Sequence, residues 1–236
     1  MGKLGAAVEA VITLAARLQR VGRSRPSARP SARPLLTDRP RVPDPVAHVA
    51  AFVQPDGTTC GSATLVLARM LNDPGYAARV LDGGPDEIKA RFARETVEMH
   101  RRTSRLWPMA WGTHPWASAR QMSRRVGGSG VPGTRYAARF VDAKDRGRLF
   151  DAIVQAVADG HVTPVFTYDL RTAQGYSGAH STLALGLEAG GLRVYDSWRG
   201  VVVTVGRAEF VEARLAGTLG WDRPGAAVLP AKRSIS

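Results

Sequence analysis

Apolar residues recur with two different periods along this chain, and the change of period separates predicted helices from predicted strands. From residue 59 to residue 159, apolar positions at helical spacing lie between turn-forming residues. Shorter apolar runs separated by turns follow, and these predict strands. We expect helices over residues 59–71, 86–105, 116–125 and 145–159, a short helix or loop over 76–81, strands over 162–168, 181–188, 191–195 and 200–205, and a last helix over 207–219 before an irregular tail.

The predicted strands are consistent with one antiparallel sheet. The segment Glu188-Ala189-Gly190-Gly191 is typical of a hairpin turn between two of them. The helix that begins near Thr59 would pack against this sheet, so the predicted fold class is α+β.

Two segments precede the predicted folded domain, which covers residues 46–236. Residues 1–21 carry apolar residues at helical spacing and predict an amphipathic helix. Three interpretations of this helix stay open: a secretory signal peptide, a helix that docks on a membrane surface or a partner protein, and a helix that packs on its own domain or stays loose. Residues 22–45 are rich in Arg, Pro and Ser and predict a linker, with a polybasic arm for nucleic acid or anionic lipid as the alternative.

The charge of the chain is strongly positive, at +13, from 33 Lys and Arg residues against 20 Asp and Glu residues. Nearly all of the basic residues are Arg, which together with abundant Ala and Gly indicates a GC-rich bacterial coding bias. We therefore expect no nucleic-acid partner, and any membrane-surface or partner-protein contact is assigned to residues 1–45. No apolar run is long enough to predict a transmembrane helix. We expect a cytoplasmic protein, with an exported or membrane-peripheral protein as the alternative.

Cys60 is the only cysteine of the chain and the candidate nucleophile. It follows the turn-forming Pro55-Asp56-Gly57 and precedes an apolar run, so we expect it in the first turn of a helix with Thr58 or Thr59 as the N-cap. Unpaired backbone N–H groups and the positive end of the helix dipole favour a thiolate at that place. A single cysteine excludes an intrachain disulfide and a cysteine-rich zinc site, and we expect neither a metal nor a cofactor.

Two later residues complete the pattern that a thiol nucleophile requires. His180 opens one apolar run and would accept the proton of Cys60. Asp196 closes the next run and would fix the orientation of the imidazole. On a hairpin these two residues fall at the same end of adjacent strands. Gln54, six residues before Cys60, can donate a side-chain N–H to an oxyanion beside the backbone N–H of Cys60.

This combination of residues resembles the papain-like cysteine peptidase superfamily, and within it the C39-like peptidase family. The likeness covers residues 46–203, whereas the Cys-Gly-Ser-Cys-Trp signature of papain itself is absent. It implies a papain-like fold, a catalytic helix packed on a C-terminal antiparallel sheet, and hydrolysis of a peptide or protein substrate. The residues that carry the resemblance are Gln54, Asp56, Cys60, Gly61, Ala63, His180 and Asp196.

Other functions of the same triad stay open. Transglutaminase-type transfer or glutamine deamidation would pass through the same acyl-thioester, and an inactive domain of this type would only hold a peptide. The candidate substrate-binding residues are Asp56, Trp111 and Trp198, and Trp198 would also cover the His–Asp pair from water. Trp107, Trp111 and Trp116 either line a substrate cleft or anchor the core.

Overall fold

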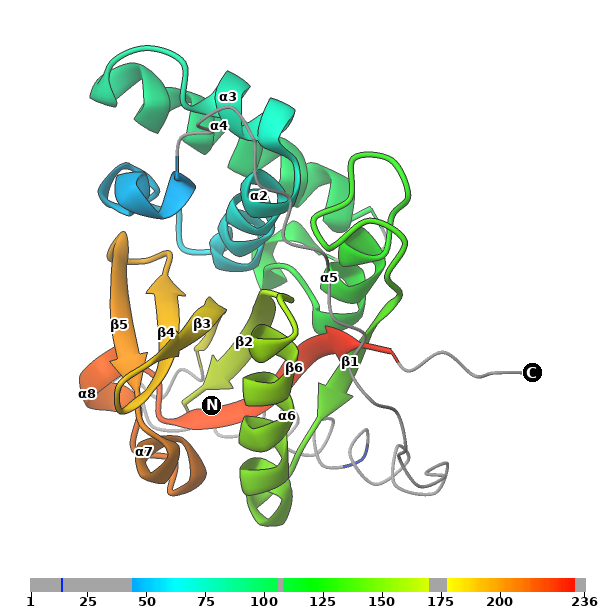
Figure 1. The fold of residues 1–236 in the computed structure, drawn as a ribbon, viewed down its shortest axis with the longest axis vertical. Coiled ribbons are helices and arrows are strands. Elements are labelled where there is room, and N and C mark those ends of the chain that lie inside the picture. Colours follow the sequence, from blue (N-terminus) through cyan, green and yellow to red (C-terminus); the bar gives the residue numbers. More distant parts are fainter. Residues whose placement is uncertain (1–13, 15–43, 106–107, 170–177, 232–236) are drawn as a thin grey trace.

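Six strands form one antiparallel sheet in the order β1-β6-β2-β3-β4-β5 (Figure 1). The computed structural model describes Leu14 and residues 44–105, 108–169 and 178–231. The strands are β1 (Tyr136–Phe140), β2 (Thr163–Tyr168), β3 (Ala179–Glu188), β4 (Gly191–Asp196), β5 (Val201–Val205) and β6 (Arg223–Pro230). The α-helices are α2 (Cys60–Asn72), α3 (Pro74–Val80), α4 (Pro85–Thr103), α5 (Pro115–Met122), α6 (Arg146–Ala158), α7 (Arg207–Val211) and α8 (Ala216–Leu219), with 3-10 helices η1 (Pro45–Ala51), η2 (Met109–Trp111) and η3 (Ala143–Asp145).

Buried apolar side chains form two clusters, one on each face of this sheet. Successive residues of a strand point to opposite faces, so Leu183 belongs to the first cluster and Ala184 to the second. The first cluster joins the sheet to α2, α3, α4 and α5, and the second joins it to α6, α7 and α8. Helices therefore cover both faces, with α6 crossing in front of β2 and β6 in Figure 1.

The predicted α+β class is confirmed, and so are the four predicted strands and the hairpin turn between β3 and β4. Gly190 in that turn has φ +99, a left-handed conformation that favours glycine. The segment over residues 76–81, left open between helix and loop, contains α3. Among the described residues, no helix is long and apolar enough to cross a membrane.

The C-terminal part of the chain differs from its prediction. The expected last helix is two short helices, α7 and α8, and the expected irregular tail is the strand β6. β6 lies inside the sheet between β1 and β2, and β1 was not predicted either. Ala226 and Ala227 of β6 are fully buried, because α5 packs on one face of this strand and α6 on the other. Small residues and two prolines carry little strand propensity, so only the pairing with distant segments makes this stretch a strand.

The predictions for residues 1–21 and 22–45 lie outside the described residues, except at Leu14, Asp44 and Pro45. Leu14 is helical and exposed. Asp44 caps η1 by accepting a hydrogen bond from the backbone N–H of Val46.

Candidate active site

Cys60 is the first residue of α2 and is 9% exposed. The loop before it is held by Asp56, whose Oδ1 accepts hydrogen bonds from the N–H of Thr58 at 2.7 Å and from its hydroxyl at 2.8 Å. Partial burial raises the pKa of Asp56, but the hydrogen bonds from Thr58 and Thr59 outweigh it and hold this pKa below its usual value. Asp56, a candidate for substrate binding, thus shapes the turn that leads to Cys60.

Thr59 occupies the N-cap position of α2, as predicted, yet its side chain does not cap the helix. The hydroxyl of Thr59 instead donates to the carbonyl oxygen of Asp56 at 3.2 Å. The N–H groups in the first turn of α2 therefore receive no hydrogen bond from the side chain of Thr59. In an α-helix such N–H groups point toward the N-terminal end, which here is Cys60.

His180 and Asp196 come together from adjacent strands, as predicted. Asp196 lies opposite Thr182, and His180 precedes Thr182 by two residues on the same face of β3. Nε2 of His180 lies 2.8 Å from Oδ1 of Asp196, and the two side chains are only 2% and 1% exposed.

The Cys60 side chain also interacts with the imidazole of His180. Burial lowers the pKa of His180, but hydrogen bonds and charge interactions with Asp196 and Cys60 outweigh it and raise this pKa to about 9. Because Nε2 is bonded to Asp196, Nδ1 is the ring nitrogen left for Cys60. The structure thus brings the three predicted triad residues into one interacting set.

Arg199 is a site residue that the sequence analysis missed. Its Nε lies 2.6 Å from Oδ2 of Asp196, and its Nη2 donates to the carbonyl oxygen of Thr218 in α8. The backbone N–H of Trp198 donates to Oδ1 of Asp196 at 2.9 Å. Burial raises the pKa of Asp196, yet His180, Arg199 and the Trp198 N–H lower it overall. A basic residue three positions after the candidate acid was the only local signal for this ion pair.

Trp221 is the aromatic residue that stacks on His180, with ring centroids 4.3 Å apart and an angle of 21° between the rings. The sequence analysis assigned this cover to Trp198. Trp198 instead contacts the edge of Trp221 at 6.4 Å and is 52% exposed. Trp221 precedes β6, and because β6 was not predicted, no local pattern could place this residue at the site.

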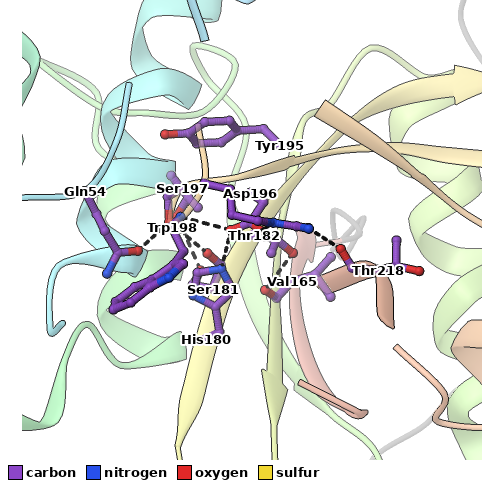
Figure 2. A network of polar contacts seen from close by, with 12 residues as sticks. Gln54, Val165, His180, Ser181, Thr182, Tyr195, Asp196, Ser197, Trp198 and Thr218 are labelled. Carbon is purple, nitrogen blue, oxygen red and sulfur yellow. Dashed lines mark hydrogen bonds and ion pairs between the residues drawn. The ribbon is translucent and has the colours of Figure 1, made fainter. Parts of the chain in front are cut away.

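Gln54 is tied to the end of β4 by two hydrogen bonds. Its backbone N–H donates to the carbonyl oxygen of Ser197 at 2.8 Å, and its Oε1 accepts from the hydroxyl of Ser197 at 2.9 Å (Figure 2). Its Nε2 donates to the carbonyl oxygen of Asp56 at 2.6 Å, which uses one of the two amide hydrogens. Gln54 is therefore held at Ser197, the residue that follows Asp196, and keeps one N–H for another acceptor.

The segment that carries Trp111 packs directly on the start of α2. A Cβ atom on Gly61 would lie 2.7 Å from Cβ of Thr113, and the hydroxyl of Thr113 is 2.7 Å from that of Ser62. Nε2 of the buried His100 lies 3.1 Å from the carbonyl oxygen of Met109 and fixes the other end of the segment. Trp111 is 66% exposed, so it is a surface residue beside the nucleophile loop rather than a core anchor.

The other two tryptophans predicted to line a cleft or anchor the core are Trp107 and Trp116. Trp116 stacks on His114 at 4.2 Å and contacts Phe140 at 4.6 Å, but it stays partly exposed. Trp107 lies outside the described residues.

In the described parts of the chain, no group of three or more His, Cys, Asp and Glu side chains is placed to hold a metal ion. Comparisons of this chain with protein-family models and with curated proteins found no match. The chemistry of the site must therefore be argued from its own residues.

Proposed function

We propose that this chain is a papain-like cysteine peptidase of the C39-like type, which hydrolyses a peptide bond in a peptide or protein substrate. One observation carries the proposal. The imidazole of His180 is bonded to Asp196 through Nε2 and interacts with the side chain of Cys60. The candidate base thus acts between the group that orients it and the candidate nucleophile, in the order that the chemistry requires.

The reaction begins with a thiolate and an imidazolium. A His180 pKa of about 9 keeps the imidazole protonated at neutral pH. A positive charge of this kind is what a thiolate nucleophile generally requires nearby. The thiolate attacks the carbonyl carbon, which forms the carbon–sulfur bond. His180 then gives a proton to the leaving amine as the carbon–nitrogen bond breaks. Water, deprotonated by His180, hydrolyses the thioester and releases the acid.

The oxyanion that forms during the attack needs N–H donors. We assign this role to the backbone N–H of Cys60 and to the free amide hydrogen of Gln54. The side chain of the N-cap residue Thr59 makes no hydrogen bond to the start of α2, so it does not compete for the N–H groups there. The hydroxyl of Ser197 holds Oε1 of Gln54, which fixes the amide orientation.

Alkylation by iodoacetamide tests the activated pair, because Cys60 is the only thiol in the chain. We expect wild type to react rapidly at pH 6, the His180→Gln variant to react slowly there, and the His48→Gln control to match wild type. Equal, slow reaction of wild type and His180→Gln would overturn the proposal.

Turnover is then measured with a peptide library by detecting the new amino termini that hydrolysis releases. Cys60→Ala should abolish hydrolysis, and full activity of this variant would rule out the proposed nucleophile. Ammonia release or incorporation of an added amine would instead assign the triad to deamidation or transfer. Retention of a peptide without turnover would assign the domain to peptide binding.

A further inference from the structure

A second site candidate lies apart from the triad, at the C-terminal ends of α4 and α5. A cavity of about 650 Å³ opens there, within the usual size range of small-molecule sites. Its lining includes Arg102, Thr103, Arg105, Trp116, Arg120 and Arg124. Four of these side chains carry a guanidinium group, and none of the described residues that line the cavity is acidic.

Three of the four arginines have no ion-pair partner among the described residues. Arg102 forms an ion pair with Glu98 at 2.6 Å. For Arg105, Arg120 and Arg124, the described parts of the chain provide neither an ion pair nor a side-chain hydrogen bond. Like charges repel, so these three guanidinium groups around one cavity cost free energy that a bound anion would reduce.

Helix polarity accounts for only part of this arrangement. Arg102 lies in the last turn of α4 and Arg120 in the last turn of α5, where the helix dipole favours cations. That effect explains why each helix ends with a basic residue. It does not explain why basic residues from two helices, together with Arg124 beyond α5, line the same cavity.

The wall between these arginines is rigid and uncharged. The ring of Trp116 stacks on His114, and Nδ1 of His114 accepts a hydrogen bond from the backbone N–H of Trp116 at 3.2 Å. Burial lowers the pKa of His114 to about 4, so the imidazole is neutral and serves as a hydrogen-bond acceptor. The cavity therefore combines a stacked aromatic surface with exposed cationic side chains.

We propose that this cavity binds a small polyanion that presents at least two phosphate or carboxylate groups. The guanidinium group is planar and donates paired hydrogen bonds that match both of these groups. Arginines from two helices can hold two anionic groups at once, and the cavity volume suits a small molecule. This inference does not depend on the activity of Cys60.

The test is calorimetric titration of the full chain with inorganic pyrophosphate and, separately, with citrate, at constant ionic strength. We expect at least one of them to bind, and the tighter one distinguishes a phosphate from a carboxylate ligand. The double variant Arg120→Gln with Arg124→Gln should weaken binding by about a hundredfold, at about tenfold for each charged contact.

A charge-matched double variant, Arg94→Gln with Arg125→Gln, provides the control. Both residues are exposed and neither lines the cavity, so binding should stay within about twofold of wild type. All the substituted arginines are exposed, and thermal unfolding would verify that both variants remain folded. Failure of both anions to bind, or equal weakening in both double variants, would overturn the proposal.

Discussion

Trp221 stacks on the imidazole of His180 at 4.3 Å, and this contact joins the segment before β6 to the start of β3. The ring covers a histidine whose hydrogen bond to Asp196 is almost inaccessible to water. Hydrogen bonds between ionisable groups are stronger where water is excluded, so the stack protects the pair on which the proposed chemistry depends.

Removal of this cover should weaken the site. We expect Trp221→Ala to lower kcat/KM by about tenfold, because water would compete for the His180–Asp196 hydrogen bond. The lost stack should also reduce the free energy of unfolding by about 1 kcal/mol. Trp198→Ala is the matched control, since the Trp198 ring lies T-shaped to Trp221 at 6.4 Å and its removal should leave the alkylation rate of Cys60 unchanged. Steady-state kinetics and urea denaturation measure both effects, and a stronger loss in Trp198→Ala would contradict this assignment.

The ion pair between Arg199 and Asp196 should contribute to stability. Arg199 is 42% exposed, so solvent screening limits the expected loss in Arg199→Gln to about 1 kcal/mol at neutral pH. The pKa of Asp196 is lowered in the folded state, so its contribution is present above the unfolded pKa of about 3.9 and is lost as pH falls.

Urea denaturation of Arg199→Gln at pH 7 and pH 3 would measure this effect, and the difference from wild type should shrink at pH 3. Arg207→Gln removes an exposed ion pair with Asp151 and should produce no measurable change. Equal stability of Arg199→Gln and wild type at both pH values would count against a structural role of Arg199.

The pKa of His180 predicts a specific pH dependence of stability. A folded pKa of about 9, against an ordinary value of about 6.5, corresponds to about 3 kcal/mol. This pKa is raised, so the stabilisation is complete below about pH 6.5 and is lost as pH rises through 9. The difference in unfolding free energy between wild type and His180→Gln should therefore shrink from pH 6 to pH 10. A difference that stays constant over this range would show that His180 does not titrate as described.

Gln54 should affect turnover but not the reactivity of the thiol. Gln54→Ala removes one proposed oxyanion donor and should lower kcat by about a hundredfold, because the oxyanion exists only during the attack. Iodoacetamide forms no oxyanion, so alkylation of Cys60 should keep its wild-type rate. Ser197→Ala removes the hydrogen bond that orients Gln54, together with a longer one to the carbonyl oxygen of Ser181, and we expect a smaller loss of kcat. Equal losses of alkylation and turnover in Gln54→Ala would indicate that Gln54 only supports the fold.

Local sequence patterns were sufficient for the elements that carry the triad. The turn at Asp56 and the apolar run after Cys60 predicted the start of α2, and the turn at Gly190 predicted the pairing of β3 with β4. Helix starts and hairpins depend on residues close together in sequence, so the sequence alone indicated that His180 and Asp196 meet at one end of two strands.

Contacts between distant segments decided the rest. β6 has small residues and prolines, and it becomes a strand only because β1 and β2 pair with it. Its position brings Trp221 to His180, and the packing of α4 beside α5 brings the arginines of the cavity together. The sequence by itself thus indicated the candidate nucleophile, base and acid, Cys60, His180 and Asp196, in their order. Tertiary structure alone decided which ring covers these residues, which charged side chain pairs with Asp196 and what packs around them. Those contacts depend on packing between distant segments and not on local periodicity.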